Sequence, residues 1–161
     1  MIRQFIIAAA SAAVLVLSPT AFAQQSNQYG TADEAKAMLL KAVAAMKADE
    51  TKALDMFTKG EGGFRDRDLY VFCAEASTGK IVAIGNPNAQ QLLGQDQRSL
   101  TDSTGKAFGV ELYLAAQKPD GEITQVSYMF VRPGADKTPV PKVSLVTRVS
   151  NLGCGVGYYK Q

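Results

Sequence analysis

Histidine is absent from the sequence, and with it the commonest general base and the commonest metal ligand in proteins. The two cysteines, Cys73 and Cys154, are far apart in the chain, so there is no C-x-x-C spacing of the kind that binds zinc. The sequence also offers no recognisable pair of a serine and a base. These absences leave acid–base, nucleophilic and metal-dependent catalysis without candidate residues. We therefore expect a protein that is not an enzyme and that uses no metal or cofactor.

A phosphate-binding loop is missing too, although glycines cluster in two places. The alternating glycines of residues 153–157 lie at the C-terminal end, so no helix can follow them to bind an anion. The glycines of residues 60–63 lack the Gly-Lys-Ser/Thr that completes a phosphate loop. Neither run predicts a nucleotide site.

Excess charge and long apolar runs are also lacking. Lys and Arg number 17 against 15 Asp and Glu, which argues against nucleic acid as a partner because such binders concentrate basic charge. The longest apolar run covers residues 5–17 and is interrupted only by Ser11. A spanning helix needs about 20 apolar residues, so we expect no membrane span in the mature chain.

The N-terminal sequence has the features of a cleavable signal peptide. Arg3 supplies a basic start, the apolar run follows, and Ser18-Pro19 ends it. Ala21-Phe22-Ala23 then provides the small residues that a signal peptidase recognises. The alternative is an anchor that stays attached. We predict cleavage after Ala23 and export to the periplasm, with residues 24–30 as a flexible leader and residues 31–161 as one domain.

In an exported protein, an even number of cysteines predicts a disulfide, here Cys73–Cys154. The alternatives are a reactive thiol or a pair of metal ligands. A bridge closing a loop of roughly 80 residues stabilises a fold by about 4 kcal/mol in the chain-entropy model.

The first third of the domain has helical spacing. Thr31 and Glu34 form a capping box, and apolar residues follow at helical intervals as far as Met46. Asp49 is a candidate cap for a second stretch that ends at Gly60. This part is one long helix or two helices in a hairpin.

Strand patterns follow the glycines of residues 60–63. We predict strands over residues 68–75, 81–84, 122–132, 142–149 and 153–159. Between the second and third strands we expect short helical pieces, at residues 90–93 and 108–117. The order is therefore helix, two strands, short helices, three strands. This order fits an α+β domain with a helix packed on a five-stranded antiparallel sheet.

This order, with a set of local motifs, resembles the PAS-like plan and in detail the single-Cache domain family, type 2, of extracytoplasmic sensor domains. The motifs that carry the resemblance are Gly63-Phe64-Arg65-Asp66, Asp68–Phe72, Asn86-Pro87-Asn88, Leu93–Asp96, Asp102–Gly109, Val126–Phe130, Arg132-Pro133-Gly134 and Pro141–Ser144. The family often has His-Pro at Asn86-Pro87 and Trp at Phe130, so its ligand preferences do not transfer. The resemblance implies a domain that binds a small molecule, with a membrane receptor or sensor kinase as a possible partner.

Strand alternation indicates where a ligand would lie. The PAS-like plan places the first and last strands side by side. If Cys73 bonds Cys154, the glycines of the last strand share a face with Tyr70 and Phe72. A strip without side chains beside aromatic walls leaves open volume; the alternative is a helix packed closely on the glycines.

The candidate ligand-binding residues on this face are Tyr70, Phe72, Tyr128, Phe130, Arg132 and Lys142. Arg132 ends the third strand, where it would clamp a carboxylate at the mouth of the cavity. Lys142, with Ser144, would add a charge and a hydroxyl. The alternatives are a solvated Arg132, a solvated Lys142 and tyrosines that only pack. We assign the charged run of residues 65–68 to surface ion pairs.

Two functions remain. The first is a periplasmic sensor-type domain for a small carboxylate or similar metabolite, acting without an output domain of its own. The second is a structural or partner-binding domain with an occluded pocket. A cavity holding several polar groups would favour the first, and a core filled by Tyr70, Phe72 and Phe130 the second.

Overall fold

The computed structural model describes residues 28–160, so the predicted signal peptide (1–23) and the first four leader residues lie outside the described part. The chain forms the following elements in order: α1 (Ala32–Ala48), α2 (Glu50–Lys59), β1 (Arg65–Asp66), β2 (Leu69–Glu75), β3 (Ile81–Ile84), η1 (Pro87–Leu92), η2 (Gln97–Ser99), α3 (Phe108–Ala115), β4 (Thr124–Val131), β5 (Pro139–Val149) and β6 (Leu152–Tyr159). The two η elements are short 3₁₀ helices.

The opening segment forms two helices because Asp49 interrupts it. Thr31 and Glu34 make the predicted capping box at the start of α1. Asp49 has an extended backbone and its side chain accepts a hydrogen bond from the Lys52 amide, so it ends α1 and caps α2. Gly60 then ends α2 in the left-handed conformation, with φ of 71°.

The strands form one antiparallel sheet in the order β3-β2-β6-β5-β4, with β1 paired to the start of β2. The five predicted strands are confirmed. The sixth, β1, has only two residues and turns back through Arg67, so it is too short to show alternation. β5 begins three residues earlier than predicted, at Pro139. Proline is tolerated there because β6 ends opposite Lys142, which leaves the first residues of β5 paired with β4 alone.

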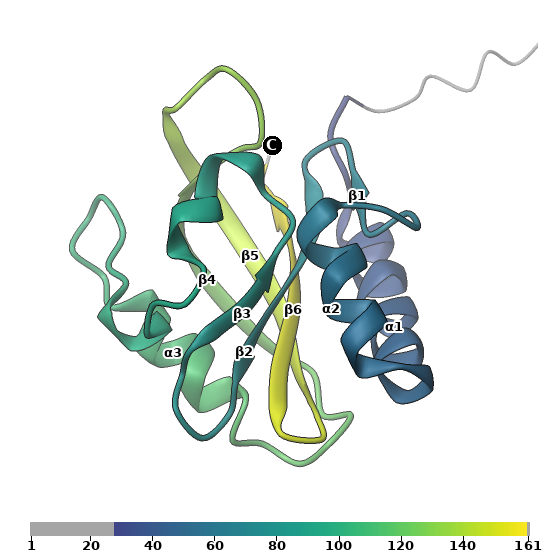
Figure 1. Ribbon diagram of the computed structural model, residues 1–161. Helices are drawn as coiled ribbons and strands as arrows, with labels where there is room; N and C mark the ends of the chain where they lie inside the picture. The colour runs from purple at the N-terminus through teal and green to yellow at the C-terminus, as the bar shows by residue number, and fades with distance from the viewer. Residues whose placement is uncertain (1–27, 161) are drawn as a thin grey trace, which may run out of the picture.

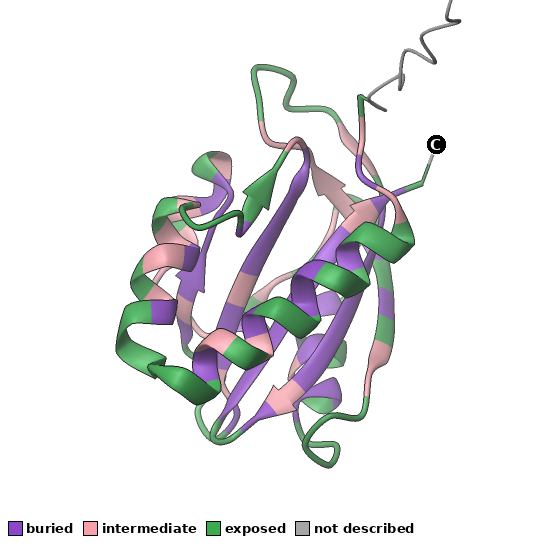
Figure 2. Ribbon diagram, turned by 90° about the vertical axis from the view of Figure 1, so that its right-hand side faces the viewer, coloured by how far each residue is buried: buried purple, intermediate pink, exposed green. Residues whose placement is uncertain are grey.

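Helices cover both faces of the sheet (Figure 1). α1 and α2 pack on one face, where Leu39, Phe57 and Val156 lie in the main apolar core. The buried residues of α1 form a stripe that faces the sheet (Figure 2). α3 and the 3₁₀ helices pack on the opposite face. Two smaller apolar clusters lie under them.

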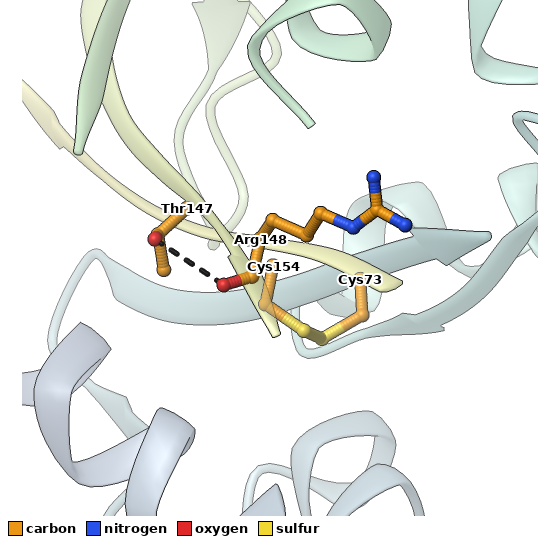
Figure 3. Close-up of a disulfide and its surroundings, with 4 residues drawn as sticks. All are labelled: Cys73, Thr147, Arg148 and Cys154. Atoms are coloured by element: carbon orange, nitrogen blue, oxygen red, sulfur yellow. Dashed lines mark hydrogen bonds between the residues drawn. A yellow bond between two sulfur atoms is a disulfide. The ribbon is translucent and has the colours of Figure 1, made fainter. Parts of the chain in front are cut away.

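The predicted disulfide is confirmed. Cys73 and Cys154 are directly opposite in the pairing of β2 with β6, with Cα atoms 4.1 Å apart (Figure 3). Both residues are buried in the core beneath α1 and α2. The bridge therefore fixes the register of the two central strands, and with it the face on which the glycines of β6 lie.

Across residues 28–160, no helix combines the length and the apolar character needed to cross a membrane.

Candidate functional site

The glycines of β6 lie on the sheet face opposite α1 and α2, as expected from the disulfide. Each makes room for neighbouring side chains: Gly153 for Ala116, Gly155 for Phe72, and Gly157 for both Lys142 and Ser144. A Cβ at Gly157 would lie 2.1 Å from Lys142 Cε. The alternative prediction, close packing on the glycines, is therefore correct at Gly153, where Ala116 at the end of α3 fills the space. At the other two positions, a candidate site residue occupies the strip.

Aromatic side chains enclose a small cavity between this face, α3 and the 3₁₀ helices. Phe108 of α3 stacks on Tyr128 with ring centroids 4.2 Å apart, and Phe130 meets Phe108 edge-on. The cavity measures about 30 Å³, room for about two water molecules. Its lining is apolar apart from Gln97 and the tyrosine hydroxyls: Tyr70, Phe72, Ile81, Ile84, Leu92, Gln97, Leu100, Phe108, Leu112, Tyr128 and Phe130.

Lys142 points into the protein behind this aromatic wall. Only 1% of the residue is exposed, and its Nζ donates a hydrogen bond of 2.5 Å to Tyr70 Oη. The ammonium also lies 4.0–5.9 Å from the ring centroids of five aromatic residues, Tyr70, Phe72, Tyr128, Phe130 and Tyr159. Among the described residues, no carboxylate forms an ion pair with it. Burial lowers the pKa of Lys142 below its ordinary value, while nearby Tyr70 and Asp68 oppose that shift.

Other buried polar groups adjoin the ammonium. Asn86 Nδ2 lies 3.4 Å from Tyr70 Oη, and Tyr128 Oη lies 2.8 Å from Ser144 Oγ. Burial raises the pKa of Tyr128 and of Tyr159 above the usual value, so both hydroxyls keep their protons at neutral pH. The tyrosines therefore add hydrogen-bonding groups without adding negative charge.

Arg132 lies outside the aromatic cavity. It lines a separate hollow of about 210 Å³, together with Tyr29 and residues 133–136. Its guanidinium lies between the rings of Tyr29 and Tyr159, 4.1 and 5.0 Å from their centroids. Arg132 Nε faces Asp68 Oδ2 at 3.4 Å. The prediction that Arg132 lies at the mouth of the aromatic cavity is therefore wrong, because Arg132 lines the separate hollow and has a carboxylate partner of its own.

Two of the sequence-based alternatives need correction. Lys142 is buried and not solvated, because it extends across Gly157 into the aromatic cluster. Asp68 does not belong to the surface ion pairs: it is 4% exposed, whereas Asp66 and Arg67 do pair at the surface as expected. Asp68 has the same parity along the strand as Tyr70, and this signal could have placed it on the cavity face.

Sequence reasoning also left Asn86 and Tyr159 out of the candidate site. Asn86 is fully buried beside Tyr70. Tyr159 pairs with Lys142 across the sheet and shares its parity with the glycines of β6, which was a usable signal. The structure brings together Tyr70, Phe72, Tyr128, Phe130 and Lys142.

Three solved structures with the same fold belong to chemotaxis or chemosensory proteins. A methyl-accepting chemotaxis protein from Vibrio parahaemolyticus aligns with a TM-score of 0.62 and 22% identity, over 79% of this chain and 86% of that one. The periplasmic sensor domain of a chemotaxis protein aligns with a TM-score of 0.59 and 23% identity, over 80% and 90%. A Cache chemosensory domain studied for carboxylic acid recognition aligns with a TM-score of 0.57 and 22% identity, over 80% and 88%. No curated protein sequence matches the chain.

The family model described as "Single Cache domain 2" matches residues 11–159, which is nearly the whole chain and includes every strand and helix described above. The strand order, with the first and last long strands adjacent at the centre, agrees with the order that this resemblance implied. The chain therefore belongs to the single Cache domain 2 family.

Proposed function

We propose that this protein is a periplasmic ligand-binding domain that recognises a small monocarboxylate through Lys142. The observation that carries the proposal is the buried Lys142 ammonium, which lacks an anionic hydrogen-bond partner within the described residues. A buried cation without a paired anion is costly. A ligand carboxylate beside Nζ would supply the missing charge, and Tyr70 is placed to hydrogen-bond the same group.

The charges around the site support an anion with a single charge. Lys142 and Arg132 are both positive, and within residues 28–160 Asp68 is the one buried acidic residue near them. Asp68 pairs directly with Arg132, which leaves one positive charge uncompensated. One carboxylate balances that charge, whereas a dicarboxylate would bring a second negative charge into an apolar enclosure.

The lining of the cavity supports a short apolar tail on the ligand. The rings and aliphatic side chains offer few hydrogen-bonding partners for an amino or hydroxyl group, and such a group would lose its hydration without replacement. The cavity of about 30 Å³ has room for about two water molecules, which is too little for a carboxylic acid with an apolar tail. Binding therefore requires side chains such as Phe72, Leu100 and Phe130 to shift; these three are only partly buried.

Export and signalling complete the proposal. The predicted signal peptide would deliver the domain to the periplasm, where the sensor domain of a chemotaxis protein with the same fold is found. The carboxylic acid specificity of another structural neighbour supports the same ligand class. A chemoreceptor or sensor kinase is the proposed partner, and the domain's role is binding rather than catalysis.

A structural or partner-binding domain with an occluded pocket is the second candidate. The small volume of the cavity favours it, because Tyr70, Phe72 and Phe130 already fill most of the available space. The two candidates differ in one measurable property: only the first predicts saturable binding of a small acid that depends on Lys142.

The test is titration calorimetry with acetate, propionate, butyrate and benzoate, with succinate, glycine and butylamine as controls, supported by thermal denaturation. A ligand present at about one hundred times its dissociation constant should add about 2.7 kcal/mol of stability. We expect at least one monocarboxylate to bind and the amine not to bind. Binding of butylamine in its place, or of none of the acids, would refute the proposal and favour the occluded domain.

A further inference from the structure

The chain just before α1 is held by three charged residues, of which Asp68 and Arg132 lie beside the candidate site. We call residues 28–30 the strap. The backbone N–H of Gly30 donates a hydrogen bond of 2.7 Å to Asp68 Oδ1, and the Tyr29 ring covers the guanidinium of Arg132. Gly30 also packs so closely on Leu69 that a Cβ there would lie 2.2 Å from Leu69 Cγ. Arg67 Nη1 also donates a hydrogen bond of 3.1 Å to the Tyr29 carbonyl. The strap is therefore held by Asp68 and Arg132 on one side and by Arg67 and Leu69 as well.

The pair that holds the strap is incompletely formed. Asp68 Oδ2 and Arg132 Nε are both buried, lie 3.4 Å apart, and have no hydrogen-bond partner among the described residues. Buried polar atoms are normally satisfied. A shift of a few tenths of an ångström toward Arg132 would turn this ion pair into a charge-assisted hydrogen bond.

Lys142 lies on the other side of the same group. The ring of Tyr159 separates the two cations, with its centroid 5.1 Å from Lys142 Nζ and 5.0 Å from Arg132 Cζ. Asp68 is near enough for its negative charge to act on Lys142. Asp68 therefore pairs with Arg132, which also holds the strap, and its negative charge acts on Lys142, the proposed anion site.

We propose that the Asp68–Arg132 pair is a latch that couples the charge at Lys142 to the docking of the strap. This inference rests on the proposed function for its natural trigger, a carboxylate at Lys142. Such an anion repels Asp68 and offsets the attraction of Lys142, so Asp68 moves toward Arg132 and their hydrogen bond forms. Since Asp68 and Arg132 both hold the strap, the strap becomes more firmly docked when ligand is bound.

The strap lies at the end of the sheet where the C-terminal end of β6 also lies (Figure 1). A change in how firmly the strap is docked therefore takes place at the end of the sheet where residues 28–30 and the end of β6 lie. Binding linkage requires the reverse effect as well: weakening the strap must weaken ligand binding by the same factor.

The test is amide hydrogen exchange of Gly30 in the mature chain, because this amide reports directly on its bond to Asp68. Wild type is measured with and without saturating propionate, and Lys142→Met is measured without ligand. Lys118→Met, which removes an exposed lysine paired with Glu122, is the matched control. We expect exchange at Gly30 to slow about fivefold or more with propionate and in Lys142→Met, and not in the control.

The outcomes separate the latch from the proposed function. If propionate binds and exchange at Gly30 is unchanged, the latch is refuted and the ligand proposal stands. If no acid binds, the ligand proposal fails, and Lys142→Met still decides the latch: unchanged or faster exchange contradicts it. In Asp68→Asn, bound propionate should no longer slow hydrogen exchange at Gly30. A response that persists in Asp68→Asn also overturns the latch.

Discussion

At the scale of single residues, the unusual feature is a lysine buried among aromatic rings. The five rings around Lys142 offer cation–π attraction, which is strongest where water is excluded. Among residues 28–160, Tyr70 accepts the one hydrogen bond that the ammonium donates. An ammonium can donate three, so two donors remain for a ligand. This arrangement favours an anion site over a purely structural role.

Lys142→Met tests this role directly. The methionine keeps much of the volume and apolar length but removes the charge, so binding of a monocarboxylate should weaken by the value of a charge-assisted hydrogen bond, roughly 1.5–3 kcal/mol. Calorimetry should therefore show a loss of roughly 10- to 150-fold in affinity. The free energy of unfolding should not fall, because replacing a buried charge by an apolar group is often neutral or stabilising. Unchanged affinity would contradict the assignment.

Gly157→Ala tests the close packing of the Lys142 side chain on the β6 backbone. The added methyl would collide with Lys142 Cε, and overpacking of this kind costs about 1–3 kcal/mol. Chemical denaturation should show that loss in the wild-type background and a smaller one in Lys142→Ala, where the lysine side chain is gone. Equal losses in both backgrounds would mean that Gly157 does not act through Lys142.

At the scale of elements, residues 102–115 form a cover over the cavity, and two side chains attach this cover to β4: Asp102, which binds the Met129 amide, and Lys106, whose Nζ donates a hydrogen bond to the Ser127 carbonyl. Asp102 accepts hydrogen bonds from the Thr104 hydroxyl and from the backbone amides of Thr104, Lys106 and Met129. The Thr104 hydroxyl and then the Met129 amide hold the pKa of Asp102 well below its usual range. Residues 102–106 lead directly into α3, whose Phe108 stacks on Tyr128. The attachment therefore positions one wall of the cavity.

Asp102→Ala should loosen this cover without unfolding the sheet. We expect the Met129 amide, which loses its acceptor, to exchange with solvent several-fold faster in hydrogen-exchange measurements. Asp136→Ala is the matched control, since Asp136 makes a similar turn with Thr138 outside the cover. Because the pKa of Asp102 is lowered in the folded state, its carboxylate stabilises the fold at pH values above the ordinary aspartate pKa. This stabilisation is lost as pH falls through the lowered pKa. Equal exchange at Met129 in wild type and Asp102→Ala would refute this attachment.

At the scale of the whole molecule, the buried lysine should appear in the pH dependence of stability. Burial lowers the pKa of Lys142 in the folded state, so between that value and about 10.4 the unfolded chain binds more protons. Stability then rises with pH over this interval. Urea unfolding of wild type and Lys142→Met should therefore converge as pH rises from neutral toward about 9.5, below the usual tyrosine pKa of about 10. Parallel stability curves would contradict a lowered pKa of Lys142 in the folded state.

Much of the fold was predictable because it depends on local signals. The Thr31–Glu34 capping box, the Asp49 cap and the alternation in the strands all act over a few residues. The disulfide followed from a count of two cysteines in a chain predicted to be exported, and strand parity then placed Tyr70 and Phe72 on the glycine face. The two-residue β1 escaped prediction because no periodicity can show in so short a segment.

The sequence by itself determined the class, the order of elements and the face of the sheet that carries the site, since periodicity and caps are encoded in neighbouring residues. Only the tertiary structure decided which charged side chains of that site are buried and which of them are paired. Whether a lysine in a strand is solvated or buried depends on what faces it from distant segments: Gly157, Tyr70 and Tyr159 for Lys142. In the same way Asp68, 64 positions before Arg132 in the numbering, became its partner because β2 and the end of β4 converge at one end of the sheet. Such long-range contacts set burial and charge pairing, and no local pattern records them.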